Sequence, residues 1–514
     1  MNTLICAGGS GTRVLEALLH LCASGLGPAS LRLLWIDPDG ANGNGDRVST
    51  LVSRYQQMHD AFATRVGEGV GLFRTKLDLL EVDGQAEGLK PWSPIQKGER
   101  LREILNVDLL GSTNTPADVV QLLFTPEELD MDLSQGFRGH PSLGSAAMSR
   151  VTLKRDEQPW RQLIEKLRND LAQDSGARVY LAGSVFGGTG AAAFYPLARF
   201  LRSVPLHNAN RLRIGVSALA PYFRFGAATM RNAPASAQQA ARAENFPLAT
   251  RGAVDFYQHL QTHESFPFDV VHWVGSDVAS DVNYSPGGAD QRNPSHFVEL
   301  IAAAGALEFF TQPETLTGSR YAGSGDAAHP ILDWKDLPLA TLSQNDVRDA
   351  LLRLLLVGTV HVGFCLPLLR LPELRRRPYR VPWYWERFAS KGESLLGEEN
   401  AKALDRLDDF FRGLHFPWWT QLHRQENVRL LNRAALEDSG GLRLDRLANL
   451  IGADDSGNAD PEAIDAFYSE MVAVPKSKGG QSGAPAYLSL LAHAADRYIV
   501  RYYKNAGEQG ASDV

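Results

Sequence analysis

Short apolar runs alternate with longer amphipathic segments over roughly the first 310 residues of the chain. Runs rich in aliphatic and β-branched residues, such as 3–7, 31–36 and 179–186, have the length of buried strands. Segments with apolar residues at helical spacing follow them, as at 14–25 after the first run. This alternation predicts an α/β fold, in which a parallel sheet carries helices on both faces.

From about residue 345 the pattern becomes mainly helical. The most apolar run, 354–369, is short for a membrane span and contains His361 and Pro367, so we expect a buried core helix and no transmembrane segment. The helical patterns in this part cover Asn345–Leu369, Ala401–Leu414, Arg424–Leu436 and Tyr487–Tyr503.

These patterns divide the chain into four parts. We expect a sheet-containing domain at 1–310, with an insertion at 44–135, and a linker at 311–344. A mainly helical domain at 345–504 and a disordered tail at 505–514 complete the chain.

Composition narrows the classes of partner. The 514 residues carry a net charge of −7, which does not favour nucleic acid. The three cysteines, Cys6, Cys22 and Cys365, have neither metal-ligand nor disulfide spacing, and the N-terminus lacks the pattern of a signal peptide. We therefore expect a cytoplasmic protein without a metal site built from its own side chains, and without a nucleic-acid partner.

Two glycine-rich turns each separate a predicted strand from a predicted helix. One is Gly187–Gly190, after the run 179–186, and the other is Gly8–Arg13, near the N-terminus. Glycine lets the backbone approach an anion, and the next helix offers unpaired N–H groups and the positive end of its dipole. Each turn predicts a phosphate site, although a tight turn alone explains a single motif of this kind.

Three further loops stand at strand ends or helix starts. Asp37-Pro38-Asp39 follows the run 31–36, where an acid can reach a sugar or Mg²⁺, although ordinary turn chemistry explains these residues too. A glycine-proline loop at 139–144 leads into a helix of small residues, and Pro221 opens a proline-aromatic loop after another predicted strand.

In this order the loops resemble those of the tubulin/FtsZ family of GTPases, in particular its divergent bacterial tubulin-like branch. The family's GGGTGSG signature corresponds to Phe186–Ala192, and the resemblance covers roughly residues 1–340. It implies a Rossmann-type parallel sheet that binds GTP or GDP, with Mg²⁺, across the five loops. The residues implied to bind the cofactor are Gly8, Gly9, Ser10, Gly11, Thr12, Arg13, Asp37, Asp39, Gly139, His140, Pro141, Ser142, Gly187, Gly188, Thr189, Gly190 and Pro221.

The resemblance extends to the helix expected at Pro294–Phe310, which corresponds to the family's central helix. In the family, Asn and Asp at the N-terminal end of that helix hold the guanine. His296 and Phe297 stand at those places here, and Asn293 is a substitute for one of them. The resemblance therefore adds these three residues to the cofactor site and leaves the choice between guanine and adenine open.

Hydrolysis in the family is completed by a second subunit, whose acidic loop after the central helix reaches the γ-phosphate. Ile331–Asp336 resembles that loop without its leading Asn. The resemblance implies Asp333 and Asp336 as catalytic residues that orient the attacking water. A pair of solvated acids beside a packed Trp334 explains the same residues without catalysis.

Three functions stay open at this point. The resemblance implies a GTP-binding protein that assembles head to tail with itself and hydrolyses GTP at the subunit contact. A non-polymerising nucleotide-binding module, with a protein partner on the helical C-terminal part, is the second. The third is a sugar-phosphate nucleotidyltransferase, because Ala7–Arg13 also looks like that family's loop, although the Leu-x-Pro and Glu-Lys-Pro motifs of that family are missing.

Overall fold

The computed structural model describes most of the chain. The residues outside the description are 64–70, 85–87, 111–114, 134–135, 138–139, 174–175, 226–244, 264–265, 277–278, 284, 286–287, 312–315, 325–330, 390–394, 437–440, 451–459, 476–481 and 505–514. Gly139 of the expected cofactor site and the tail expected to be disordered therefore lie outside the described residues.

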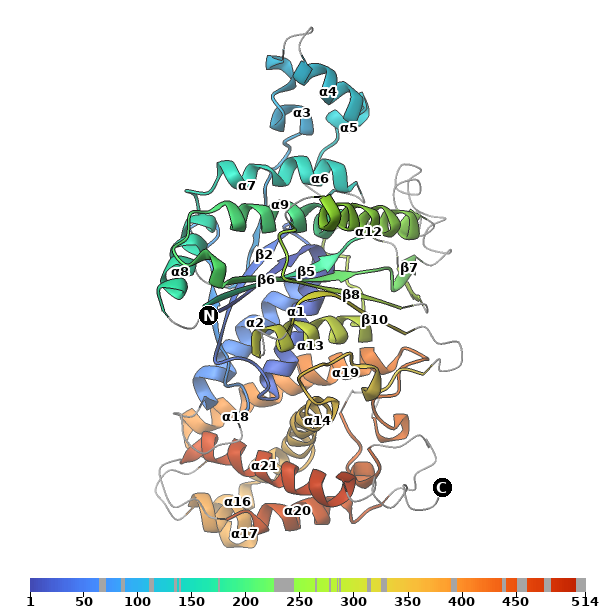
Figure 1. Ribbon diagram of the computed structural model, residues 1–514. Coiled ribbons are helices and arrows are strands. Elements are labelled where there is room, and N and C mark those ends of the chain that lie inside the picture. Colours follow the sequence, from blue (N-terminus) through green and yellow to red (C-terminus); the bar gives the residue numbers. More distant parts are fainter. Residues whose placement is uncertain are drawn as a thin grey trace.

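A parallel sheet forms the centre of the first part, as the strand–helix alternation predicts (Figure 1). Its strand order is β10-β8-β6-β5-β1-β2-β3, and β4 pairs with the end of β2. A separate two-stranded sheet joins β7 (Phe223–Phe225) and β9 (Ser280–Val282). The strands of the main sheet are β1 (Asn2–Ala7), β2 (Ser30–Ile36), β3 (Lys76–Leu79), β4 (Pro91–Trp92), β5 (Ala177–Ser184), β6 (Leu212–Leu219), β8 (Val270–Ser276) and β10 (Gly318–Ser324).

Helices cover both faces of this sheet (Figure 1). One face carries α1 (Gly8–Ala23), α2 (Gly43–Phe62) and α13 (Phe297–Thr311). The other carries α6 (Pro141–Met148), α7 (Arg150–Leu153), α8 (Trp160–Ala172), α9 (Thr189–Ser203) and α12 (Asn245–His263). The α/β class is therefore confirmed. Both faces of the sheet carry apolar side chains, because helices bury both of them.

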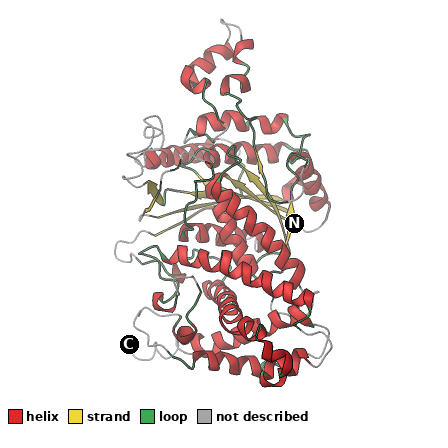
Figure 2. Cartoon of the chain, turned by 180° about the vertical axis from the view of Figure 1, so that it is seen from behind, coloured by secondary structure: helices red, strands yellow, loops and turns green. Residues whose placement is uncertain are grey.

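The C-terminal part is mainly helical and packs below α1, α2 and α13 (Figures 1 and 2). A helix is absent from Arg424–Leu436, contrary to the prediction, since the described residues there form only a short 3₁₀ turn at Arg433–Ala435. The helices are α14 (Gln344–Val360), α15 (Leu366–Leu369), α16 (Pro372–Arg376), α17 (Pro382–Tyr384), α18 (Glu398–Phe410), α19 (Phe416–His423), α20 (Ala463–Ala473) and α21 (Gly483–Ile499).

One continuous helical stretch, Gln344–Leu369, has the length and apolar character of a membrane span, but most of it is buried inside the protein. It runs from α14 through the π-helical turn His361–Cys365 into α15. Burial against neighbouring helices is the expected environment of an apolar core helix.

Helix α13 is apolar apart from Glu299 and Glu308, and every residue from Phe297 to Phe310 is buried between the sheet and the C-terminal helices. The connections β5–α9–β6 and β8–α13–β10 run the same way along the sheet, yet α9 and α13 lie on opposite faces. The two connections therefore have opposite hands, whereas crossovers of this type are almost always right-handed. Residues Gly318–Ser324, inside the expected linker 311–344, form β10, which pairs with β8 as a strand of the main sheet.

The expected insertion at 44–135 is too long. Helix α2 packs on α1, and β3 and β4 pair with β2, so residues up to Trp92 belong to the sheet domain. The described residues of 101–132, which exclude 111–114, form a small projection at the end of the molecule farthest from the C-terminal helices (Figures 1 and 2). We call this projection the 101–132 lobe; it contains α3 (Leu101–Ile104), a 3₁₀ turn (Val107–Leu109), α4 (Thr115–Leu123) and α5 (Pro126–Leu129).

Candidate functional site

The two glycine turns meet where the connections of the sheet change direction. From β1 the chain continues to β2 on one side, whereas β5, on the other side of β1, starts the series β5, β6, β8 and β10. Helix α1 follows β1 on one face and α9 follows β5 on the opposite face (Figure 1). In open α/β sheets ligands bind in the crevice that such a change of direction creates, outside the carboxyl ends of the strands.

The turns are in direct contact. A β-carbon built on Gly8, which has a φ of +69°, would lie 3.2 Å from Thr189 Cβ and 3.9 Å from the Gly190 nitrogen. One built on Gly11 would lie only 2.4 Å from the Ala182 oxygen, so the start of α1 packs on β5 with no room for a side chain. The sequence motifs, far apart along the chain, therefore form a single surface.

Neither helix start at this surface has a side-chain cap among the described residues. Ala7 precedes α1 and Gly188 precedes α9, and neither residue can supply a capping oxygen. Gly9, Ser10, Gly187 and Gly188 are partly exposed, whereas most of their neighbours are buried. Two positive helix ends thus face the same solvent-accessible spot, and an anion bound there would accept their N–H groups and offset the mutual repulsion of the two dipoles.

The start of α6 lies beside the start of α9. Gly144 packs against Ala192, where an added β-carbon would come within 2.5 Å of the alanine methyl group, and the Ser145 hydroxyl donates to the Ala192 oxygen. His140 and Pro141 are partly exposed and Ser142 is exposed at this helix start. The third predicted loop is therefore placed next to the glycine turns.

The loop after β2 is held by its own polar side chains. Asp37, which is 3% exposed, accepts from the Asp39 nitrogen and from Asn42 Nδ2, and burial raises the pKa of Asp37 to about 7. Asp39 accepts from the Gly288 nitrogen at 2.7 Å. A β-carbon built on Gly9 would lie 3.1 Å from Asn42 Nδ2, so this loop forms a wall beside the glycine turn of α1.

His296 and Glu299 cap the N-terminus of α13. His296 Nδ1 accepts from the Val298 nitrogen, and Glu299 accepts from the His296 nitrogen at 2.9 Å. Burial, and then the nearby Arg13, lower the pKa of His296 to about 3, so the ring is neutral and able to accept. Phe297 is fully buried, which leaves its side chain no surface with which to contact a base.

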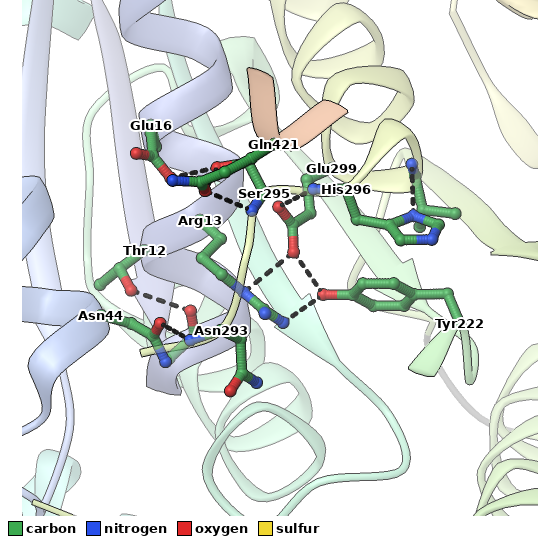
Figure 3. Close-up of polar contacts among 12 residues, drawn as sticks. Thr12, Arg13, Glu16, Asn44, Tyr222, Asn293, Ser295, His296, Glu299 and Gln421 are labelled. Atoms are coloured by element: carbon green, nitrogen blue, oxygen red, sulfur yellow. Dashed lines mark hydrogen bonds and ion pairs between the residues drawn. The ribbon is translucent and has the colours of Figure 1, made fainter. Parts of the chain in front are cut away.

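Arg13 lies inside the protein, between Glu299 and Tyr222 (Figure 3). Its Nε is 2.9 Å from Glu299 Oε1, its Nη2 donates to the Tyr222 hydroxyl, and that hydroxyl donates to Glu299. Although burial opposes the charge, Glu299 and Tyr222 hold the pKa of Arg13 above its ordinary value. The guanidinium thus ties α1, α13 and the loop of Pro221 together, which differs from the phosphate-neutralising role that the nucleotidyltransferase alternative needs.

Helix α19 of the C-terminal part reaches the same end of α13. Gln421 accepts from the nitrogen and the hydroxyl of Ser295, and Gln425 Nε2 donates to the Ser295 oxygen. Asn293 donates its backbone N–H to Asn44, and its side-chain amide extends away from the contacts drawn in Figure 3. The C-terminal helices are therefore joined by hydrogen bonds to the segment that precedes α13.

Asp333 and Asp336 lie on a short 3₁₀ turn after β10, where Asp333 caps the turn Trp334–Asp336. Asp333 accepts from the Lys335 nitrogen, and Asp336 accepts from the Asp333 nitrogen at 2.7 Å. Trp334 anchors the turn by donating to the Leu430 oxygen. Both carboxylates thus cap their own turn, and Asp336 is exposed.

Sequence reasoning missed the buried network around Arg13. Glu299 is the acidic residue in the first turn of an otherwise apolar helix start, three positions after His296, and that spacing is typical of a capping box. Tyr222, by contrast, carries no local signal of its partners, since it meets Arg13 from a different loop.

No protein-family model and no curated protein matches the sequence. The described residues contain no group of three or more His, Cys, Asp or Glu side chains placed to hold a metal ion. Two cavities among the described residues lie elsewhere, one at the amino edge of the sheet around Arg32 and Asp78 and one among the C-terminal helices. The case for a ligand at the glycine turns therefore rests on their geometry and on the resemblance.

Proposed function

We propose that this chain binds a nucleoside triphosphate, GTP with Mg²⁺, at the carboxyl edge of a tubulin/FtsZ-like sheet. The observation that carries the proposal is the contact between two uncapped helix starts, at Gly8 and Thr189, at the point where the sheet's connections change direction. Backbone N–H groups bind phosphate without a lysine when several of them converge.

The residues around this point fit a nucleotide. Gly9, Ser10, Gly187 and Gly188 are accessible for phosphate contacts, and the start of α6 stands beside them. The loop of Asp37–Asn44 faces the same turn and offers amide and carboxylate groups for a ribose or for an outer ligand of Mg²⁺. Mg²⁺ bound to phosphates keeps several waters, so a cluster of protein carboxylates is not required.

Of the three residues that the resemblance implies for the nucleotide base, the structure favours only one. Phe297 is buried and His296 is committed to capping α13, so we leave both out of the proposed site. Asn293 is 8% exposed, and its side-chain amide points away from the contacts drawn in Figure 3, so we propose it as the residue that reads the base.

The proposal includes self-assembly and GTP hydrolysis at a subunit contact, and that part rests on the resemblance. Both acids cap their own turn, but Asp336 is exposed whereas Asp333 is half-buried, so we propose Asp336 as the residue that reaches the γ-phosphate of a second subunit. We expect an Asp336→Ala chain to bind GTP normally and to hydrolyse it more slowly.

The direct test uses the purified full chain. Acid extraction followed by chromatography identifies a nucleotide that copurifies, and calorimetry with GTP or ATP, each with Mg²⁺, measures affinity. Binding of GTP with a one-to-one stoichiometry supports the proposal. A chain that carries no nucleotide and binds neither compound at millimolar concentration would contradict it.

The second candidate is a non-polymerising nucleotide-binding module. The hydrogen bonds from Gln421 and Gln425 to Ser295 favour it, because they join the C-terminal helices to the edge of the site and could report its occupancy to a partner. Sedimentation with and without GTP separates the candidates, since the first predicts larger species and the second predicts none.

A further inference from the structure

The 101–132 lobe exposes an apolar surface that nothing in the described chain covers. On α4 the exposed apolar side chains are Val119 (46% exposed), Leu122 (85%) and Leu123 (61%), and Leu109 (83%) lies on the 3₁₀ turn of the same lobe. The spacing of the three residues on α4 places them on one face of the helix. Exposed apolar groups gathered in this way mark interaction surfaces on soluble proteins.

Acidic residues surround this surface. Between residues 101 and 132 the chain has seven Asp and Glu residues and a single basic one, Arg102. Asp118, on α4 itself, is exposed beside the apolar face. A partner surface for the lobe should therefore be an apolar hollow with positive charge around it, because a like-charged surface would be repelled.

The chain carries such a hollow at its other end. A cavity of about 490 Å³ lies between α15, α16 and the start of α18, and Leu369, Leu396 and Leu404 are among its apolar lining residues. Its volume falls within the range of about 300–1,000 Å³ found for small-ligand pockets, which is large enough for two leucine side chains. Three charged residues, Arg370, Arg376 and Asp405, also line it.

The segment beside this cavity is strongly basic. Residues 370–380 contain five arginines and one glutamate, and Arg376 is exposed. Arg370 pairs with Asp405, an exposed residue on α18, at 2.7 Å. Arg376 and the other arginines of 370–380 leave this side of the cavity with excess positive charge, so the cavity offers an apolar floor beside a basic segment where the lobe has apolar side chains beside acidic residues.

We propose that the α4 face of one copy of this chain docks in the α15–α16–α18 cavity of the next copy. Figure 1 places α4 of the lobe at one end of the molecule and α16, which lines the cavity, at the other, so one chain cannot bring its own two surfaces together. A contact between different surfaces repeats from copy to copy and gives a ring or an open filament. This inference deepens the self-assembly part of the proposed function and rests on it, but the contact itself uses no nucleotide.

The test is sedimentation of the full chain without nucleotide over a range of protein concentrations. Leu122→Lys places a positive charge on the lobe's apolar face, and Arg376→Glu reverses a charge at the cavity. We expect each variant to weaken self-association at least tenfold. Val254→Lys, a matched change at an exposed apolar residue of α12, which is 40% exposed and away from both surfaces, should leave it unchanged.

Mixing distinguishes this contact from any symmetric dimer. The Leu122→Lys chain keeps an intact cavity and the Arg376→Glu chain keeps an intact lobe, so an equimolar mixture should form one-to-one dimers that grow no further. Circular dichroism spectra and melting curves like those of the native chain show that the variants are folded, and Leu122→Ser replaces Leu122→Lys if the lysine variant is not.

Three results would overturn the inference. One is a native chain that stays monomeric at 100 µM both with and without GTP, which would also remove self-assembly from the proposed function. Another is self-association, with or without GTP, that neither variant weakens. That result would refute this contact and leave the proposed function intact. The last is a mixture in which no dimer forms although each variant is folded.

Discussion

Gly188→Asp separates nucleotide binding from folding. Gly188 directly precedes α9, has the helical backbone angles φ −77° and ψ −61°, and is partly exposed beside the start of α1. Any residue can adopt these angles, so the substitution requires no left-handed backbone. It places a carboxylate where we propose that a phosphate binds.

The added carboxylate has two electrostatic effects: it repels the bound phosphate, which weakens GTP binding, and it interacts favourably with the helix dipole, which stabilises the fold. A carboxylate roughly 5 Å from a phosphate charge, at an effective dielectric constant of about 20, opposes binding by about 3 kcal/mol. Since about 1.4 kcal/mol corresponds to a tenfold change, affinity should fall by roughly 200-fold. The same negative charge at a helix N-terminus stabilises the fold by about 0.3–1 kcal/mol. Binding and stability should therefore move in opposite directions.

Calorimetry with GTP and Mg²⁺ measures the affinity, and urea unfolding without nucleotide measures the stability. Gly188→Asn is the matched control, because it adds nearly the same volume without the charge, and it should retain most of the affinity. Equal GTP affinity in the native and Gly188→Asp chains would refute phosphate binding at this helix start. A loss of the same size in Gly188→Asn would show that volume, rather than charge, is responsible.

Three further predictions follow from the described contacts. Glu299→Gln leaves Arg13 as a buried charge without its anionic partner and should lower the free energy of unfolding, measured in urea, by about 3–5 kcal/mol. The control is Asp281→Asn, which removes an ion pair whose two side chains are 63% exposed and should lower the same free energy by less than about 1 kcal/mol. Equal losses in the two variants would contradict the burial argument. Native Asp37, with a pKa raised by burial to about 7 against 3.8 for the ordinary carboxyl, keeps its proton where the unfolded chain has lost it. The free energy of unfolding should therefore fall by about 1.4 kcal/mol per pH unit between pH 5 and 6 relative to Asp37→Asn, and by about half of that near pH 7; a constant difference between the two chains would count against it. Asp336→Ala should keep the GTP affinity and slow hydrolysis at least tenfold, so an unchanged rate would exclude Asp336 from the reaction.

Local pattern is sufficient for the strand–turn–helix units and their order. Strands β1, β2, β5 and β6 appear at or near the predicted runs because a short apolar run bounded by glycine or proline has few alternatives to a buried strand. In a parallel sheet all strands end at the same edge, so the glycine turns were bound to share that edge. Their direct contact needed only that β5 be the neighbour of β1.

Strand β3 shows where local pattern fails. Its four residues, Lys76–Leu79, carry two charges, and nothing in so short a segment distinguishes a strand from a loop. It becomes a strand because the edge of β2 offers unpaired backbone groups beside it, and because Asp78 meets Arg32 and Lys166. The length of the insertion was overestimated for that reason.

The sequence by itself determined the α/β class, the positions of the glycine turns and the presence of a helix near Pro294–Phe310, since these depend on periodicity and on glycine within a few residues. Only the tertiary structure decided what Arg13 does, because its partner Glu299 lies far away along the chain and on the other helix. It also decided the hand of the β8–α13–β10 connection and the placing of the lobe and the cavity at opposite ends. Local propensity acts over a helical turn, whereas the pairing of charges and the choice of sheet face are settled by which surfaces meet when the whole chain packs.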